Sequence, residues 1–442
     1  MKTMKIPRRV IDGPHQKQDG NAVSNSSLNN RRIAGLAMVA IVLMLSLTVT
    51  YSRPVAGDGT DRYGELWITQ QAAGRISILH PYSVLVGSPV ETINLPAGAH
   101  PHITTFSPDS RFAYVSDMGN GTLYVIRADD RQIVGALHLA PTLVHQAKPS
   151  PDGTIVLVSQ IANQTLFRIA ANEASQTWTA SGSLKLTSTG KAPICTVFRN
   201  DGLRAYVSLL PSGIAVVDVP TMTLLGTIPT DGFIACGMIK SHDGNTVFIA
   251  SSGSGGHLYL LDTTSDTLID TGHALGAGSW HSFNISPNER VGYGTSPGVD
   301  QLQIIDLQQR TATPFFLDPT PGTGNDQPDA IAVQGNNVYV TLRMSGKLAV
   351  IDAQQLTVSY IDLAPPSTSV NPANCMGCAL HGVTVRPEPD LTGTNISLSS
   401  PSPASLAFAL AAKRNSHIHI IGISKAAQGT AEPIDFLLHC GL

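Results

Sequence analysis

The sequence predicts an all-β fold, a single β-propeller, and two observations carry this prediction. A short motif, consisting of a hydrophobic strand that ends in Ser-Pro-Asp-Gly or a variant of it, recurs seven times at spacings of 42 to 52 residues. Each copy is followed by two β-rich runs joined by a Gly/Asn-rich turn, which indicates a hairpin. A period in the forties with this content is typical of four-stranded propeller blades.

Each copy of the motif begins five residues before its serine or the residue that replaces the serine, and we call this first residue the lead position. In a propeller the innermost strands begin at one rim of the central channel, so the lead residues should converge there. The seven lead positions are His102, His145, Ile194, Cys236, His281, Asp329 and His381. Six of them are residue types that bind metals.

The number of blades follows from counting hairpins. Eight hairpin patterns are present, the first from Glu65 and the last from Leu406, but there are only seven motifs. The first blade must therefore take its innermost strand from elsewhere, and residues 433–442 are the predicted donor, because such an exchange closes the ring and removes open sheet edges. We expect eight blades, with seven as the alternative.

Other strand residues are predicted to serve the architecture. Aromatic side chains at equivalent hairpin positions should pack between blades; these are Trp67, Tyr114, Tyr206 and Tyr339. Aspartates that end the third run of a blade should form Asx turns; these are Asp218, Asp262, Asp306 and Asp352.

The N-terminal region predicts export and a membrane anchor. Residues 33–51 form a run of nineteen without charge, long enough to cross a hydrocarbon core of about 30 Å. In residues 1–32, Lys and Arg outnumber Asp and Glu, so the positive-inside rule predicts that this tail stays in the cytoplasm. A cleaved signal peptide is the alternative; the length of the run and the lack of a nearby Ala-x-Ala site favour an uncleaved signal-anchor. Residues 52–62 form a tether, and residues 63–442 form the extracytoplasmic propeller.

Composition excludes some classes of function. The formal net charge is -3 and 13% of the residues are charged, with no basic stripe beyond the N-terminus, so nucleic acid is not expected as a partner. No nucleophile elbow, phosphate-binding loop or dinucleotide fingerprint is present.

The lead positions predict a metal site in the central funnel. Imidazole and thiolate groups suit copper, zinc or iron, and a carboxylate adds a harder ligand or a base. The predicted ligands are His102, His145, Cys236, His281 and His381, with Asp329 as the candidate catalytic group. The alternatives are a site for an anion or a small polar ligand, and a wet channel mouth without any site.

Cys375 and Cys378 precede the last lead residue in a C-x-x-C-x-x-H pattern with His381. This spacing differs from the C-x-x-C-H pattern that attaches haem covalently. The two thiolates can bind a soft metal, form a disulfide, as is common in exported proteins, or act as a redox dithiol. Cys195 lies beside the lead residue Ile194 and reaches the rim only if the strand is irregular there.

The run of Y-V-S or Y-V-T, a Gly/Asn turn, L-x-V-I-D and then P-H-x-x-x-x-S-P-D-G resembles the YVTN family of propeller repeats over about residues 64–442. The resemblance implies a propeller with a central funnel, often in an exported or surface protein. Propellers related by architecture hold the copper site of nitrous oxide reductase and the haem of nitrite reductases. The motifs are specific for architecture and unspecific for function.

Together these observations lead us to expect a membrane-anchored, extracytoplasmic propeller that binds a transition metal, with copper favoured and zinc as the alternative. If it is an enzyme, it is expected to be a metal-dependent oxidoreductase acting on a small molecule in the funnel. The alternatives are a non-catalytic ligand-binding or scaffold propeller, with a protein partner on one face, and a carrier of non-covalent haem or another tetrapyrrole.

Overall fold

The structure is a computed structural model, and it describes residues 64–80, 90–230, 232–252, 257–274, 281–317, 326–367 and 378–387. Backbone contacts divide the chain into Met1–Tyr63 and Gly64–Leu442. The predicted anchor at 33–51 and the predicted closing strand at 433–442 lie outside the described residues. Within those residues, no helix has the length and apolar character needed to span a membrane.

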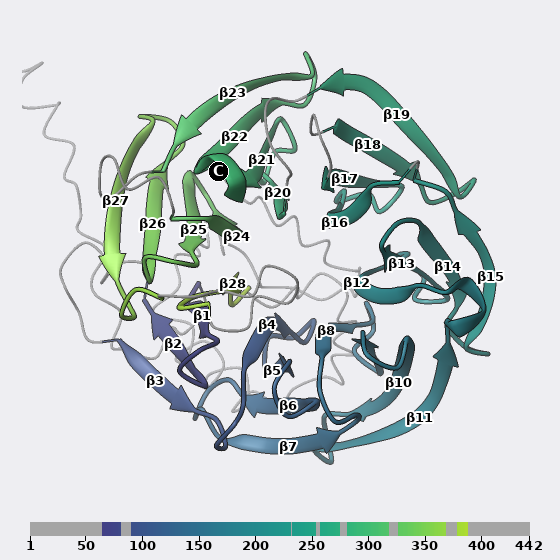
Figure 1. Ribbon diagram of the computed structural model, residues 1–442. Coiled ribbons are helices and arrows are strands. Elements are labelled where there is room, and N and C mark those ends of the chain that lie inside the picture. Colours follow the sequence, from purple (N-terminus) through teal and green to yellow (C-terminus); the bar gives the residue numbers. More distant parts are fainter. Residues whose placement is uncertain are drawn as a thin grey trace, which may run out of the picture. The chain divides into compact units, whose positions relative to one another are not determined.

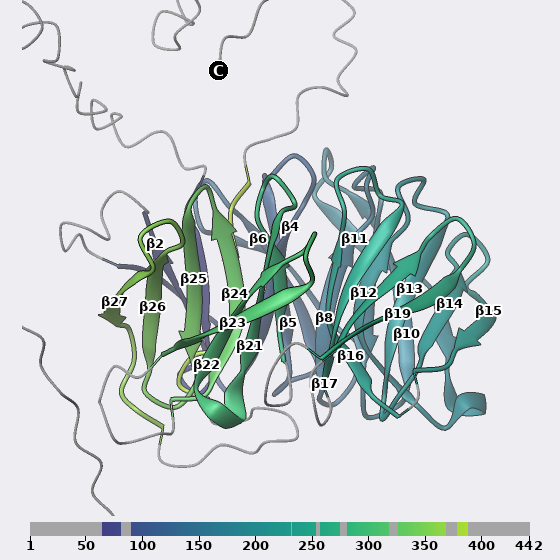
Figure 2. The ribbon, with the colours of Figure 1, turned by 90° about the horizontal axis from the view of Figure 1, so that it is seen from above.

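Seven four-stranded antiparallel sheets surround a central channel, with the strands of each sheet following one another from the axis outward (Figure 1). Seen from the side, the sheets stand next to one another as blades (Figure 2). Each innermost strand contacts the innermost strand of the next blade, so these strands form the channel wall. The predicted all-β propeller of four-stranded blades is confirmed.

Blades 1 to 4, each given from its innermost to its outermost strand, have the following bounds. Blade 1 is β28 (Val383–Val385), β1 (Leu66–Gln70), β2 (Arg75–Leu79) and β3 (Glu91–Asn94). Blade 2 is β4 (Pro101–Phe106), β5 (Phe112–Asp117), β6 (Thr122–Arg127) and β7 (Ile133–His138). Blade 3 is β8 (Val144–Pro149), β9 (Ile155–Gln160), β10 (Thr165–Asn172) and β11 (Thr177–Lys185). Blade 4 is β12 (Ala192–Phe198), β13 (Arg204–Leu210), β14 (Ile214–Asp218) and β15 (Thr223–Ile228).

Blades 5 to 7 complete the ring. Blade 5 is β16 (Ile234–Lys240), β17 (Thr246–Ser252), β18 (His257–Asp262) and β19 (Thr267–Ala274). Blade 6 is β20 (Phe283–Ile285), β21 (Val291–Ser296), β22 (Gln301–Asp306) and β23 (Thr311–Phe316). Blade 7 is β24 (Pro328–Gln334), β25 (Asn337–Leu342), β26 (Lys347–Asp352) and β27 (Thr357–Asp362). Two 3₁₀ turns, Thr187–Thr189 and Pro297–Val299, lie between strands of the described region.

The expectation of eight blades is wrong, because the described ring closes with seven. The strand that completes the first hairpin is the seventh motif itself: β28 pairs antiparallel with β1, with Val383 opposite Ile68 and Val385 opposite Leu66. Each motif thus supplies the innermost strand of one blade, and the last motif reaches back to the first hairpin. This pairing joins the two ends of the propeller and leaves no open edge between them.

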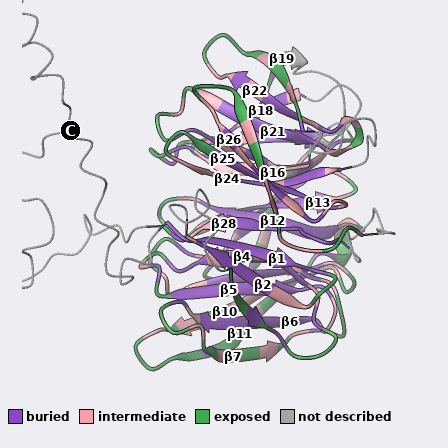
Figure 3. Cartoon of the chain, turned by 90° about the vertical axis from the view of Figure 1, so that its left-hand side faces the viewer, coloured by how far each residue is buried: buried purple, intermediate pink, exposed green. Residues whose placement is uncertain are grey.

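The hydrophobic core consists of seven clusters of buried side chains, one between each pair of neighbouring blades. The inner strands are therefore buried on both faces, whereas outer strands such as β7 alternate between exposed and partly buried residues (Figure 3). The predicted packing role of the hairpin aromatics is confirmed: Trp67, Tyr114, Tyr206 and Tyr339 are at most 1% exposed and belong to these clusters.

The Ser-Pro-Asp turns are stabilised by hydrogen bonds of their own side chains. The hydroxyl of Ser107 donates to Asp109 Oδ1 at 2.7 Å and accepts from the N–H of Phe112 at 3.0 Å. The same donation is made by Ser150, Ser241 and Ser286 to the residue two positions on. The predicted Asx turns are also confirmed, because Asp218, Asp262, Asp306 and Asp352 accept backbone N–H groups two or three residues on.

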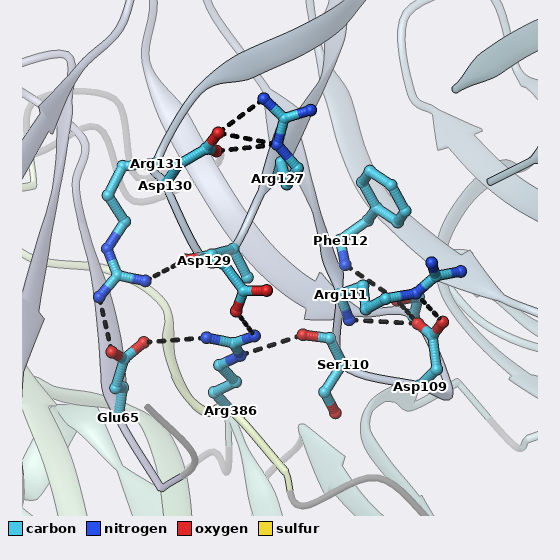
Figure 4. Close-up of polar contacts among 12 residues, drawn as sticks. Glu65, Asp109, Ser110, Arg111, Phe112, Arg127, Asp129, Asp130, Arg131 and Arg386 are labelled. Atoms are coloured by element: carbon cyan, nitrogen blue, oxygen red, sulfur yellow. Dashed lines mark hydrogen bonds and ion pairs between the residues drawn. The ribbon is translucent and has the colours of Figure 1, made fainter. Parts of the chain in front are cut away.

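An ionic group centred on the buried residues Glu65 and Arg386 holds the closure of the ring (Figure 4). Arg386 stands where four of the other motifs have the serine, and it is 1% exposed. Its guanidinium lies 3.8 Å from Glu65 Oε2 of the first hairpin, donates to Ser110 O at 3.0 Å, and bonds to the Asp129 carboxylate. Arg131 reaches Glu65 Oε1 at 2.6 Å from blade 2. We call Glu65, Asp129, Arg131 and Arg386 the closure cluster, since they tie the last motif to the first two blades.

Candidate metal centre in the central channel

The lead residues meet at one rim of the channel because the innermost strands are irregular there. Regular pairing between first and second strands is interrupted between Pro101 and Thr104, and similar interruptions occur at the lead positions of β8, β12, β16 and β24. A β-bulge lets two consecutive residues turn toward the same side, and such bulges recur next to active sites. In β12 the bulge brings Cys195 to the channel, as the prediction of an irregular strand allowed.

A ring of hydroxyl groups fixes the backbone of the lead residues. The Thr341 hydroxyl accepts from the N–H of Ala330 in its own blade at 3.0 Å and donates to His381 O in the next blade at 2.5 Å. The same double contact, with the carbonyl of the next lead residue, is made by Thr69, Ser116, Ser159 and Thr295. This hydroxyl belongs to the Tyr-Val-Ser/Thr element of the repeat, so the repeat itself positions the lead residues.

Asp329 is the electrostatic centre of the site. It is fully buried, and its Oδ1 bonds to His281 Nδ1 and to Arg343 at 3.0 Å. Its Oδ2 lies 3.3 Å from His381 Nε2. Burial raises the pKa of this carboxyl, but the nearby Arg343 guanidinium, with His281 and His381, outweighs burial and holds the pKa well below its usual range. Asp329 therefore remains ionised at neutral pH.

His381 presents a lone pair to this carboxylate. Its Nδ1 lies 3.0 Å from His102 O, and a carbonyl can only accept, so Nδ1 carries the proton. In the neutral ring Nε2 is then an acceptor that faces Asp329 Oδ2, and no described group donates to it. Two acceptors at 3.3 Å need a cation between them or a second proton on the ring. The arrangement is the one expected of two metal ligands.

Burial keeps three imidazoles of this rim neutral, those of His102, His145 and His381. It lowers the pKa of His381 to about 4, with the Asp329 carboxylate opposing this shift. It lowers the pKa of His145 to about 3, and the charges of His381 and His281 add to the effect. Burial and the neighbouring His381 also lower the pKa of His102 well below its ordinary value. Neutral imidazoles have the lone pairs that metal ions need.

Three of the predicted residues come close enough to share one ion. The candidate ligand atoms of His281, Asp329 and His381 lie within 4.8 Å of one another. His102 stacks on His381 with ring centroids 3.7 Å apart, and His145 meets His102 edge-on at 4.6 Å. The Nδ1 atoms of His102 and His145 are buried and have no hydrogen-bond partner among the described residues. Cys236, the lead residue of the fourth motif, lies within β16, and its side chain is outside the description.

Sequence reasoning missed Arg343, the second charged group of the site. It follows β25 at a position where the corresponding residues of other blades are uncharged, such as Gln71, Met118 and Leu210. The residue is 5% exposed, and its Nε has no hydrogen-bond partner among the described residues. A single charged residue at an otherwise neutral repeat position is the signal that points to it.

A cavity of about 170 Å³ adjoins the cluster on the channel side. His145, His281 and His381 lie at its wall, together with Cys195, Gln146 and Ser282. Using about 30 Å³ for each water molecule, its size suits a few waters or one small molecule. An ion at His281, Asp329 and His381 can therefore keep an open coordination position toward the cavity.

The cysteines of the C-x-x-C pattern are only partly described. Cys378 is fully buried and disulfide-bonded, while Cys375 lies outside the described residues. Cys195 is present as a thiol, so the partner of Cys378 is one of Cys236, Cys375 and Cys440. A disulfide sulfur is not a thiolate, so Cys378 is no metal ligand in this oxidised state, and the metal-binding roles of both cysteines stay predictions for the reduced protein.

Comparison with known proteins identifies the architecture. No family model matches the chain, and neither does any curated protein sequence, so the YVTN resemblance stays a prediction. Solved structures do match. Hydrazine synthase of Kuenenia stuttgartiensis superposes with a TM-score of 0.52 at 16% identity, over 63% of this chain and 90% of that chain.

Two further solved structures share the fold. Dihydro-heme d1 dehydrogenase NirN, in complex with DHE, has a TM-score of 0.51 at 14% identity over 73% of this chain and 75% of that one. The Cps50 (Swd1) β-propeller domain of Myceliophteria thermophila has a TM-score of 0.50 at 9% identity, over 61% of this chain and 87% of that chain. The predicted relation to propellers of haem enzymes is confirmed for the fold, and identities this low carry no further conclusion.

Proposed function

We propose that this protein binds one transition-metal ion in its central channel, with His281, Asp329 and His381 as ligands. The observation that carries the proposal is the pair of acceptors, His381 Nε2 and Asp329 Oδ2, that face each other at 3.3 Å. A metal ion satisfies both at once. The hydroxyl ring and the contact of His381 Nδ1 with His102 O orient the ligand, as partners of metal-binding histidines commonly do.

Copper is the favoured metal and zinc the alternative. A set of two imidazoles and one carboxylate suits several first-row metals, among which Cu²⁺ binds nitrogen and oxygen sites most tightly. If the protein is an enzyme, the open position toward the cavity suits metal-dependent redox chemistry on a small molecule. Asp329 stays ionised beside Arg343, which favours a ligand role over proton transfer.

The tetrapyrrole alternative has the support of one fold relative, NirN in complex with DHE. The size of the channel cavity counts against it, because about 170 Å³ is below the roughly 300 Å³ at which pockets for drug-sized ligands begin. We therefore expect that adding haem to the purified protein gives no absorption band near ~400 nm, the band expected when a His ligates haem. A stable band there would contradict the metal-ion proposal and support a tetrapyrrole carrier.

The proposed setting is the extracytoplasmic side of a membrane, with residues 33–51 as a single-pass anchor. The nineteen-residue uncharged run and the basic residues before it support this placement. We expect the full-length protein to remain in the membrane fraction after alkaline carbonate washing and its propeller to be digested by external protease. Release into the soluble fraction at a reduced mass would instead indicate a cleaved signal peptide.

Metal analysis of the full-length protein tests the central proposal. After loading with Cu²⁺ or Zn²⁺ and removal of excess metal, we expect about one ion per chain. His381→Ala and His281→Ala should each reduce retention severalfold or more, because each removes one of three ligands. His138→Ala, which changes an exposed histidine at the end of β7, should retain the wild-type amount.

Less than ~0.2 ion per chain in folded wild-type protein contradicts the proposal, because a three-ligand site binds stoichiometrically under these conditions. Circular dichroism and thermal melting establish that each variant is folded. If the His102→Ala, His281→Ala, His381→Ala triple variant still captures a small ligand that the wild type captures, the protein is a binding module without a metal.

A further inference from the structure

A second cavity, of about 320 Å³, lies at the other end of four innermost strands. It is lined by the ends of β4, β8, β12 and β16 and by the turns that follow β4 and β8, including Pro108 and Pro151. Along β8, Lys148 follows His145 by three residues, which is about 10 Å of extended chain. The cavity is therefore separate from the histidine rim, although Met238 contributes to the walls of both channel cavities.

Two lysines enter this cavity from different blades. Lys148 comes from β8 and Lys240 from β16, and both are partly buried. Lys240 Nζ bonds to the side-chain oxygen of Asn200, while Lys148 has no hydrogen bond to another described residue. No ion pair joins either lysine to a carboxylate of the described chain, and no Asp or Glu lines the cavity.

The carboxylates nearest in sequence are already engaged in the turns. Asp152 accepts from the hydroxyls of Ser150 and Thr154, and Asp243 accepts from Ser241 and Asn245. Burial and the charge of Lys240 lower the pKa of Lys148, and burial lowers the pKa of Lys240. Two partly buried ammonium groups that line one cavity without a carboxylate counter-ion are costly, since they repel each other and burial removes part of their hydration.

We propose that this cavity binds a small organic anion, with Lys148 and Lys240 as its counter-charges. The other walls are apolar, formed by Phe106, Pro108, Phe198 and Met238. They suit a ligand with an apolar body and one carboxylate, and a pocket of this size holds a molecule of about ten non-hydrogen atoms. An anion between the two lysines removes their mutual repulsion and replaces the water they lose.

Titration calorimetry of the full-length, metal-free protein with benzoate tests this inference. We expect binding by the wild type, and at least tenfold weaker binding by Lys148→Met, because a hydrogen bond to a charged group is lost. Lys240→Met should weaken binding as well, and the double variant should abolish it. Lys185→Met, which changes an exposed lysine at the end of β11, should bind as the wild type does. Benzyl alcohol, the neutral counterpart of similar shape, should not bind.

A second measurement uses the unaltered protein. Benzoate should protect Lys148 from acetylation by a small reagent, as read by mass spectrometry, while leaving Lys185 reactive. No binding of benzoate up to ~10 mM, which corresponds to less than about 3 kcal/mol of affinity, overturns the proposal. Equal binding by the lysine variants, or binding of inorganic phosphate without binding of benzoate, overturns it too. The metal-free protein is used so that these outcomes do not depend on the proposed metal centre.

Discussion

Two groups of charged residues in this propeller, each built around a buried carboxylate, differ in how completely their members satisfy one another. In the closure cluster, Glu65 is shared by Arg131 and Arg386, and Arg386 also meets Asp129 and Ser110 O (Figure 4). At the channel rim, the Asp329 carboxylate faces Arg343 and two imidazoles, those of His281 and His381. We call His102, His281, Asp329, Arg343 and His381 the axial cluster.

The difference lies in the groups that are left over. In the axial cluster three buried atoms, His102 Nδ1, His381 Nε2 and Arg343 Nε, have no hydrogen-bond partner among the described residues. In the closure cluster one buried atom, Arg386 Nη1, makes no hydrogen bond within the cluster, but it faces the Glu65 carboxylate at 3.8 Å. An unmatched buried polar atom costs about 1–3 kcal/mol, so such atoms are retained where a ligand satisfies them. The closure cluster alternates carboxylates and guanidiniums across three segments and thereby serves stability. The comparison separates a structural ionic group from a functional one.

The largest effect on stability is expected in the closure cluster. Glu65→Gln leaves Arg131 and Arg386 buried without their shared carboxylate, so unfolding free energy should fall by about 3 kcal/mol. Chemical denaturation of the full-length protein measures this loss, and metal retention should not change. Asp130→Ala, which breaks the exposed Arg127–Asp130 pair shown in Figure 4, should leave the transition where it is. If Glu65→Gln also reduced metal retention, the two clusters would not have separate roles in stability and metal binding.

The next effect concerns the axial cluster and is an effect on affinity. Asp329→Asn keeps the size of the side chain but removes the charge between Arg343 and His381, so metal affinity should fall about 100-fold. Competition with a chromogenic chelator measures the change. An unchanged affinity in a folded variant would show that Asp329 serves only to compensate Arg343, as Glu65 does for its arginines.

A smaller effect is expected in the hydroxyl ring. Thr341→Val keeps the shape but removes the bonds to Ala330 N and His381 O, which should cost about 1–2 kcal/mol of stability. Metal affinity should also decrease, because the backbone of His381 loses its support. Thr357→Val, at an exposed position of β27, is the matched control. A variant that loses stability but binds metal normally would limit the ring to an architectural role.

The smallest effect is a pH dependence from Glu173, a partly buried carboxylate outside both clusters. Burial, with Asp109 nearby, raises the pKa of Glu173 from 4.5 to about 7, even though Arg111 lies 3.6 Å away. The folded state then holds this proton more tightly than the unfolded state, so stability should decrease as the pH rises from about 4.5 through about 7.

Glu173→Gln removes this dependence and should stabilise the protein by about 1 kcal/mol at pH 8 and by little at pH 5. Thermal melts at both values measure the difference. The opposite sign, with greater wild-type stability at pH 8, would place Glu173 with the paired carboxylates such as Glu65 and not with those that lack a close partner.

The sequence predicted the convergence of distant residues because the repeat period carries topological information. His102 and His381 lie 279 residues apart, yet both open an innermost strand, and in a ring of blades such positions meet at the axis. The number of motifs, seven, also equals the number of blades in the described ring. The prediction of eight failed because the strand that pairs with the first hairpin was sought outside the motifs, whereas the last motif itself supplies it.

The local chemistry of the repeat was thus determined by the sequence alone: Ser and Asp side chains satisfy the turn they belong to, and apolar runs buried on both faces pack blade against blade. The roles of Arg343 and Arg386 were decided only by the tertiary structure. Arg343 is a single departure from the repeat, whereas Arg386 stands at a position that Arg199 and Gln334 also occupy in other motifs. The partner of Arg343, Asp329, lies 14 residues away, and the partner of Arg386, Glu65, lies in the first hairpin. Charge pairing depends on distances in space. The repeat predicts these distances for residues at its regular positions, but it does not predict the partners of residues that depart from it.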